Sequence, residues 1–454
     1  MKSIFFFLVL ALCVNVIPAK ALVNVQDSLA LVDLYNSTDG PNWNNHTNWL
    51  TSSPVSTWSG IEVTNNRVIR ISLNQNKLNG SIPSSLGNLV NLIYLFLSGN
   101  QLSGCIPSSL GNLVHLASLD LDANRLTGSI PSSLGNLVNL GSLHLAFNRL
   151  TGSIPPSLGN LVVLYDLDLS YNMLTGSIPS SFGNLKLSHL VLGNNQLSGS
   201  IPSFLGNLGG LRSLLLDGNR LSGSIPSSLG NLGNLRLLFL DNNQLSGSIP
   251  SSFSNLNPLG IIGLTHNYFT FDGMELIAQT FGNGFYSKQH RIPIHQHGNT
   301  LSVSAGGTLS NNTYKWYRFR HAGDTIIIKG DSVFHPTQNG KYLVRVKNSI
   351  ATELTLFSDS IVYIAPAIIA SAENALQQNG KTILFRVYPN PTKDILHVET
   401  NGSVTFSLIN QSGKILSTTN ITGKGSINVS GITPGLYYLK NNSTQTVLKV
   451  VIAK

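Results

Sequence analysis

The feature that most constrains this chain is a repeat with a period of about 24 residues. Eight complete units fill residues 68–258, and they begin at Val68, Leu92, Leu116, Leu140, Leu164, Leu187, Leu211 and Leu235. The unit at Leu164 is one residue shorter than the other seven, and a ninth unit begins at Leu259. Each unit follows the pattern LxxLxLxxNxLxGxIPxxLGNLxx, as in residues 116–139. One such unit is too small to bury its own apolar face, so the sequence predicts a solenoid of units that stack and cover one another.

The first part of each unit predicts a short strand with one buried face. Leu119 and Leu121 alternate with Asp120 and Asp122, so we expect the leucines to face the core and the aspartates to face water. An asparagine follows each strand where the chain turns, and its amide can donate to one backbone segment and accept from the next. We expect an internal ladder made of Asn76, Asn100, Asn124, Asn148, Asn172, Asn195, Asn219, Asn243 and Asn267.

The repeat units resemble plant-type leucine-rich repeats, and the resemblance covers residues 68–258 without a gap. It implies an α/β leucine-rich-repeat solenoid, with a parallel β-sheet on the concave face and a short helical or irregular convex side. Residues 22–67, with Trp43, Trp49 and Trp58, resemble the N-terminal cap of such proteins. Because the cap cysteines usual in the family are missing, we expect aromatic packing to hold this cap together.

The repeat pattern fails after Asn267, and the segment FTFDGMELIAQTF predicts a short helix that closes the solenoid, which would then span residues 68–281. Alternating runs between 282 and 364 predict a β-sandwich. Trp316 and Tyr342 resemble the core tryptophan and the tyrosine corner of an immunoglobulin-like domain, with Val344 in place of the second cysteine. A linker is expected at 365–380.

The last segment, 381–454, predicts a second small all-β sandwich. It resembles the C-terminal sorting domain of the bacterial type IX secretion pathway. The matching residues are Tyr388, Pro389, Asn390, Pro391, Gly413, Pro434, Gly435, Tyr437 and Lys454. The resemblance implies a Gram-negative cell, recognition of 381–454 by the type IX secretion machinery, and either release or anchoring to lipopolysaccharide after sorting.

Residues 1–21 predict a signal peptide, because Lys2 precedes an apolar run and small residues stand at Ala19 and Ala21. Cleavage after Ala21 would leave Cys105 as the one cysteine, so we expect no intramolecular disulfide. No other apolar run approaches the roughly 18 residues needed to cross a bilayer, so no transmembrane segment is expected.

The formal net charge of +9 first raises the question of a polyanionic partner. Residues 68–258 hold eight Lys and Arg against six Asp and Glu, whereas 283–351 hold nine basic residues and two acidic ones. The excess lies in one later segment, so the sequence favours no nucleic-acid partner. That segment, around Lys315, Arg318 and Arg320, is the alternative location for ligand recognition.

Stacking places equivalent strand residues in columns on the concave face, roughly 4.8 Å apart. Repeats two to five combine aromatic rings, carboxylates and histidines in these columns, and clusters of exposed rings and like charges are costly without a ligand. The candidate ligand-binding residues are Tyr94, Phe96, Asp120, Asp122, His144, Phe147, Asp166, Asp168, Tyr171 and His189.

Catalytic and metal sites are not expected. The carboxylates of Asp120 and Asp168, on either side of His144, would stand roughly 10 Å apart, too wide for one compact metal shell. His295 and His297 alternate along a run, but a polar loop explains them more simply. We also find no P-loop, dinucleotide fingerprint or nucleophile elbow, so no cofactor is expected.

The sequence therefore predicts a non-catalytic recognition or adhesion protein, secreted or held on the outer-membrane surface, that binds a protein or glycan on its concave face. Two alternatives stay open. Plant proteins with this repeat include polygalacturonase inhibitors, so the resemblance also allows an inhibitor of a foreign polysaccharide hydrolase. The other alternative is a structural surface component without a discrete ligand.

Overall fold

The computed structural model describes residues 23–282, 286–319, 325–364, 376–378, 381–383, 385–443, 445 and 447–453, so the expected signal peptide and most of the expected linker lie outside the described residues. The chain forms two compact units. The first runs through Ile292 and includes Ser304–Thr313 and Arg345–Phe357, and the second comprises Pro293–Val303, Tyr314–Val344 and Ser358–Lys454. No helix in the described part of the chain is long and apolar enough to cross a membrane.

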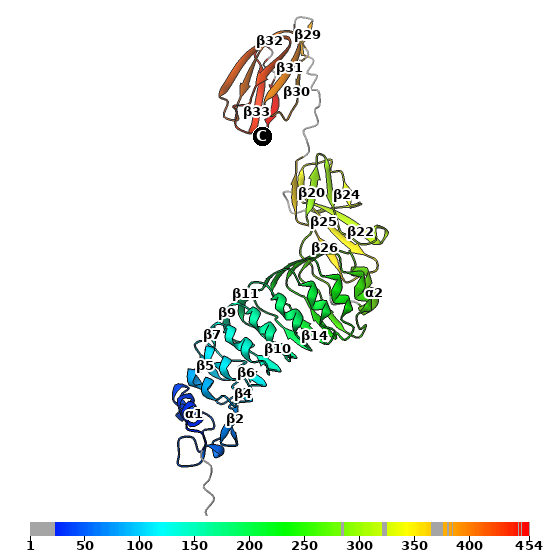
Figure 1. Ribbon diagram of the computed structural model, residues 1–454. Coiled ribbons are helices and arrows are strands. Elements are labelled where there is room, and N and C mark those ends of the chain that lie inside the picture. Colours follow the sequence, from blue (N-terminus) through cyan, green and yellow to red (C-terminus); the bar gives the residue numbers. More distant parts are fainter. Residues whose placement is uncertain are drawn as a thin grey trace, which may run out of the picture. The chain divides into compact units, whose positions relative to one another are not determined.

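The concave side of the solenoid is a ten-stranded sheet (Figure 1). Its strands, in spatial order, are β1 (Ile61–Thr64), β2 (Arg67–Ser72), β4 (Tyr94–Phe96), β6 (Ser118–Asp120), β8 (Ser142–His144), β10 (Asp166–Asp168), β12 (His189–Val191), β14 (Ser213–Leu215), β16 (Leu237–Phe239) and β18 (Ile261–Gly263). β1 is antiparallel to β2, and every later neighbour is parallel. The predicted parallel sheet is therefore confirmed.

The opposite side carries one short 3-10 turn in each repeat. These are η3 (Ser84–Asn88), η4 (Ser108–Asn112), η5 (Ser132–Asn136), η6 (Pro156–Asn160), η7 (Ser180–Asn184), η8 (Ser203–Asn207), η9 (Ser227–Asn231) and η10 (Ser251–Asn255). A proline in extended conformation precedes every one of them, such as Pro131 before η5. Because proline restricts φ, it determines where the chain enters the turn.

A second series of parallel strands runs beside the main sheet, and the sequence analysis did not predict it. The strands are β3 (Asn79–Ser81), β5 (Gln101–Ser103), β7 (Thr127–Ser129), β9 (Arg149–Ser153), β11 (Met173–Thr175), β13 (Ser198–Gly199), β15 (Arg220–Gly223), β17 (Gln244–Gly247) and β19 (Tyr268–Phe269). Gly128 in β7 has φ of 76°, and a Cβ there would lie 2.7 Å from the sulfur of Cys105. The positive φ recurs at the equivalent glycines of the other repeats, so the backbone favours glycine there, whereas the close approach to Cys105 is specific to Gly128.

The expected asparagine ladder is confirmed. Asn124 donates from Nδ2 to the carbonyl oxygens of Leu97 and Leu121, at 3.0 and 3.1 Å. Its Oδ1 accepts the N–H of Leu102 at 2.9 Å. The nine ladder asparagines are at most 9% exposed. Buried amides with all their partners add rigidity without the penalty of an unsatisfied polar group.

The N-terminal cap consists of α1 (Val25–Ser37), η1 (Gly40–Asn42) and η2 (Val55–Thr57). Its three tryptophans are buried, with ring centroids 4.9 Å apart for Trp43 and Trp49 and 4.8 Å apart for Trp49 and Trp58. This confirms aromatic packing in place of disulfides. The buried carboxylate of Asp27 accepts from the Arg67 side chain and from the N–H of Val68, which ties α1 to the first repeat.

The closing helix is confirmed as α2 (Met274–Phe281). Its Glu275 carboxylate accepts hydrogen bonds from the side chains of Thr308, Asn311 and Asn348. Thr308 and Asn311 lie in the segment Ser304–Thr313, which contains η11 (Leu309–Asn311), and Asn348 lies in Arg345–Phe357. Both segments belong to the first compact unit.

The immunoglobulin-like region is all-β. Its strands are β20 (Ile294–His297), β21 (Thr300–Val303), β22 (Asn312–Phe319), β23 (Thr325–Gly330), β24 (Val333–Phe334), β25 (Gly340–Asn348), β26 (Thr355–Phe357) and β27 (Ile361–Tyr363). Trp316 is fully buried and donates from Nε1 to the carbonyl of Asp331. The hydroxyl of Tyr342 donates to the carbonyl of Gln338 at 2.7 Å, which is the hydrogen bond expected of a tyrosine corner. Val344 is fully buried, as expected.

The C-terminal region is also all-β and antiparallel. After the short pair β28 (Leu376–Gln378) and β29 (Lys381–Ile383), its sheet contains β30 (Phe385–Tyr388), β31 (Ile395–Ile409), β32 (Ile415–Asn428), β33 (Gly435–Asn441) and β34 (Val447–Ile452). Phe406, Leu439 and Val450 are among the fully buried residues of its core. It thus has an apolar core of its own, separate from that of the solenoid.

Candidate functional site

The register of the concave sheet confirms the predicted columns. In the central column, Phe96 pairs with Asp120, Asp120 with His144, and His144 with Asp168. The flanking column brings Asp166 beside His189. The leucines between these positions are fully buried, so the candidate residues on the strands point out of the sheet.

The residue just before each ladder asparagine has a left-handed backbone. Phe147 and Tyr171 occupy this position with φ of 52° and 53°. Four other repeats have glycine or asparagine there, and the remaining three have Gln75, Ala123 and His266. A left-handed conformation suits glycine and asparagine and is unfavourable for an aromatic residue. The two rings are nonetheless stacked, with centroids 4.2 Å apart, and are 55% and 48% exposed. Together they make an exposed flat surface at the edge of the sheet.

A second aromatic pair lies in repeat two. The Tyr94 and Phe96 rings have centroids 5.9 Å apart. The guanidinium of Arg70 lies 4.1 Å from the Tyr94 ring centroid and also pairs with Glu62 at 3.0 Å. The sequence analysis missed Arg70, although it occupies the position equivalent to Tyr94 in the preceding repeat, and the two pair in one column.

His144 and Asp166 form a pair across neighbouring strands. Nε2 of His144 lies 3.2 Å from Oδ2 of Asp166, and both side chains are partly buried. Their hydrogen bond raises the pKa of His144 and lowers the pKa of Asp166. Because Asp166 accepts at Nε2, the other ring nitrogen, Nδ1, remains available on the side away from Asp166.

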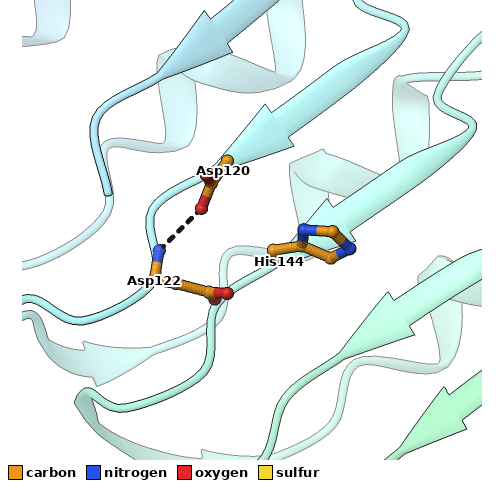
Figure 2. A group of neighbouring side chains, drawn as sticks. All are labelled: Asp120, Asp122 and His144. Carbon is orange, nitrogen blue, oxygen red and sulfur yellow. Dashed lines mark hydrogen bonds between the residues drawn. The ribbon is translucent and has the colours of Figure 1, made fainter. Parts of the chain in front are cut away.

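Asp120 and Asp122 lie on the other side of His144 (Figure 2). Oδ1 of Asp120 accepts the N–H of Asp122 at 3.1 Å, and Oδ1 of Asp122 accepts the N–H of Ala146 at 2.5 Å. Burial raises the pKa of Asp122 to about 7; the Ala146 N–H opposes this shift, and the charge of Asp120 adds to it. One potential ligand atom from each of Asp120, Asp122 and His144 lies within 4.8 Å of the other two.

Asp168 and His189 are held by local contacts. Oδ1 of Asp168 accepts from both the N–H and the hydroxyl of Ser170. Nδ1 of His189 lies 3.1 Å from the hydroxyl of Ser213. Asp122, rather than Asp168, therefore joins Asp120 and His144 in the potential ligand group, a grouping that the sequence analysis did not make.

Other features of the surface bear on the alternatives. His295 and His297 are exposed on β20, and in the described residues they belong to no group of three potential metal ligands. Arg318 is only 7% exposed and bonds to Gln338, so of the basic segment Lys315 is exposed, Arg318 is not, and Arg320 lies outside the described residues. Tyr165, 53% exposed, is a further ring that the sequence analysis missed.

Comparison with protein families gives two matches. A Leucine Rich Repeat model matches eight consecutive segments, namely 67–89, 91–113, 115–137, 139–161, 164–185, 186–208, 210–232 and 234–256. A Secretion system C-terminal sorting domain model matches residues 386–453. A search of curated proteins found no match.

Solved structures similar to this chain include that of the Arabidopsis receptor kinase HAESA in complex with the peptide hormone IDA and the co-receptor SERK1. The identity is 34% and the TM-score 0.53, over 60% of this chain and 46% of that chain. The PEPR1–AtPEP1 structure is 32% identical, with a TM-score of 0.49 over 58% of this chain and 45% of that one. A plant ice-binding protein is 28% identical, with a TM-score of 0.46, and the match covers 59% of this chain and 96% of that one. This chain thus spans less than half the length of the two receptor chains.

The repeats, their parallel sheet and the HAESA likeness, which covers 60% of this chain, agree on the solenoid fold, and the second family match accounts for the C-terminal domain. The sorting domain directs export by the type IX pathway to the cell surface or beyond. The chain is therefore a secreted leucine-rich-repeat protein with a type IX C-terminal sorting domain, and an all-β region lies between the two in sequence.

Proposed function

We propose that this protein is a non-catalytic recognition or adhesion protein that binds a basic polypeptide segment on the concave face of repeats two to five. The observation that carries the proposal is the stacked pair of Phe147 and Tyr171, exposed at backbone positions that disfavour aromatic residues. Exposed rings held rigidly beside polar groups are typical anchors of protein interfaces. The complex of HAESA with a peptide hormone supports a polypeptide ligand for this repeat type.

The charge of the face favours a basic ligand. Asp120 and Asp122 lie at and just after the end of β6, and Asp166 and Asp168 lie in β10, with β8 between them, whereas the chain as a whole is basic. His144 neutralises part of this charge when it is protonated, through its pair with Asp166. Lysine or arginine side chains of a partner would find carboxylate acceptors here, and such complementarity mainly increases the association rate and specificity.

A binding experiment tests the proposal. The full chain is applied to an array of peptides and glycans, and the best ligand is titrated against wild type and the double variant Phe96→Ala/Tyr171→Ala. Loss of central aromatic anchors typically costs at least about 2 kcal/mol, so we expect affinity to fall roughly 30-fold or more. Phe239→Ala is the matched control, because Phe239 occupies the same column as Phe96 in repeat eight and we expect it to leave binding unchanged.

Each alternative predicts a different result. Unchanged binding by the double variant, together with loss on Lys315→Glu, would move recognition to the basic segment. A preference for glycans across the array would show that the ligand is a glycan rather than a polypeptide. Inhibition of a polysaccharide hydrolase without array binding would favour the inhibitor, and no binding at all would favour a structural surface component.

A further inference from the structure

We propose that Asp120, Asp122 and His144 bind one divalent metal ion of the zinc or manganese type, with coordination positions left open toward the concave surface. The site shares Asp120 and Asp122 with the proposed recognition face, so its test uses metal ions alone and no polypeptide ligand.

The spacing of the three side chains fits a single ion after a small closure. One ligand atom from each residue lies within 4.8 Å of the others. Donors about 2.1 Å from a tetrahedral zinc ion stand roughly 3.4 Å apart. Rotation of the two aspartate carboxylates would bring the donors closer, and each carboxylate keeps one oxygen free of the backbone hydrogen bonds described above. Figure 2 shows Asp120 at the end of its strand, Asp122 in the turn that follows, and His144 on the neighbouring strand.

Groups outside the three ligands orient them. Asp166 accepts from Nε2 of His144, which leaves the Nδ1 lone pair directed away from Asp166. The N–H of Ala146 holds Oδ1 of Asp122. A histidine held by a carboxylate on its second nitrogen is the usual arrangement around protein-bound zinc, since the carboxylate sets the tautomer and increases the basicity of the metal-binding nitrogen.

The donor set indicates the class of ion. One imidazole nitrogen with two carboxylate oxygens suits zinc and manganese, whereas calcium and magnesium favour sites made of oxygen alone. Three protein ligands on an accessible surface leave a position for water or for an oxygen of a bound molecule. A divalent ion would also offset the repulsion between the neighbouring carboxylates of Asp120 and Asp122.

Calorimetric titration of zinc and manganese into the chelator-treated full chain tests the proposal, with calcium as the comparison ion. His295→Ala/His297→Ala serves as the background, so that these exposed histidines do not contribute. We expect one equivalent of zinc to bind and to be lost in Asp120→Asn/Asp122→Asn/His144→Ala. Asparagine keeps the oxygen that accepts from the backbone, and the single variant His144→Asn gives a second test if the triple variant unfolds.

Two further variants sharpen the result. Asp166→Asn should lower zinc affinity about 10- to 100-fold without removing a ligand, because it weakens the contact that orients His144 and makes its metal-binding nitrogen more basic. Asp217→Asn is the matched control, since Asp217 follows β14 at the position that Asp122 has after β6, and we expect no change. X-ray absorption of the zinc-loaded protein should show only nitrogen and oxygen ligands, with one imidazole.

The proposal is overturned if wild type and the triple or His144→Asn variant bind zinc with the same stoichiometry and affinity. It is also overturned by sulfur in the zinc shell, which would point to Cys105. Because no polypeptide ligand takes part in this titration, a negative result leaves recognition by Phe96 and Tyr171 untouched, and loss of that recognition leaves the metal result untouched.

Discussion

Repeats two to five and repeats six to eight share one backbone but present different surfaces. Both have the buried leucines, the asparagine ladder and the left-handed residue before each asparagine. In the central column, the earlier repeats have Phe96, Asp120, His144 and Asp168, whereas the later ones have the apolar Val191, Leu215 and Phe239.

The left-handed position makes the difference clearest. Gly218 has φ of 64° there and Asn242 has φ of 54°, close to the 52° of Phe147. The backbone therefore does not require a ring in repeat four, and a ring costs of order 1 kcal/mol in this conformation. The comparison teaches that packing between repeats determines the buried residues. The surface residues of repeats two to five, in contrast, include ones that the backbone conformation disfavours.

The largest expected effect tests whether buried and surface positions are correctly assigned. Leu145→Ala removes a fully buried side chain and should lower the free energy of unfolding by roughly 2–5 kcal/mol. Asp120→Ala, on the exposed side of the neighbouring strand, should change it by about 0.5 kcal/mol. Denaturant titration of both variants measures the difference, and equal effects would mean that the two faces are inverted.

The second prediction concerns the ladder. Asn148→Ala removes the acceptor of the Leu126 N–H and the donor to the carbonyls of Leu121 and Leu145. Buried backbone groups left without partners should cost about 1–3 kcal/mol. Asn139→Ala is the control, because Asn139 is exposed and bonds only to the Val114 carbonyl, so we expect at most about 0.5 kcal/mol. A ladder that contributes nothing would give the same unfolding midpoint for both variants.

The third prediction exchanges the two surfaces at the left-handed position. Gly218→Phe should destabilise by about 1 kcal/mol, since φ is 64° and a Cβ would approach Oδ1 of Asn194 to 2.8 Å. Phe147→Gly should be close to neutral, because relief of the backbone offsets the loss of a stacked pair worth about 0.5–1.5 kcal/mol. If Phe147→Gly instead destabilises by more than Gly218→Phe, the ring is there for stability rather than for a ligand.

Much of the fold could be predicted because each buried position recurs in every repeat unit. Leucine and asparagine recur at the positions of Leu145 and Asn148 in eight other repeat units. The same recurrence predicts which residues form the columns. The second series of strands was missed because β7 consists of Thr127, Gly128 and Ser129, residues that equally suit a turn.

The candidate site was predicted less completely. Asp122 lies beyond the end of β6, where strand alternation no longer predicts the direction of a side chain, so its approach to His144 could not be read from the pattern. The column argument that predicted Tyr94 could also have predicted Arg70, because the two residues pair in one column. The pairing of His144 with Asp166, rather than with Asp168 in its own column, depends on rotamers that the sequence does not determine.

The smallest expected effect concerns Glu275 in α2, the helix that closes the solenoid. Burial by itself would raise the pKa of Glu275, but hydrogen bonds from Asn348, Thr308 and Asn311 outweigh it, so the pKa lies below its ordinary value of 4.5. A carboxylate whose pKa is lower in the folded state stabilises the fold above its unfolded pKa and loses that contribution as pH falls through the folded value. We therefore expect Glu275→Gln to lower the free energy of unfolding at pH 7, and the difference from wild type to shrink below about pH 4.5. Denaturant titrations of the two proteins at pH 7 and pH 3.5 measure this change, and a difference independent of pH would show that Glu275 acts through packing alone. Asn148→Ala should show no such pH dependence, because the ladder contacts that it removes carry no titratable group.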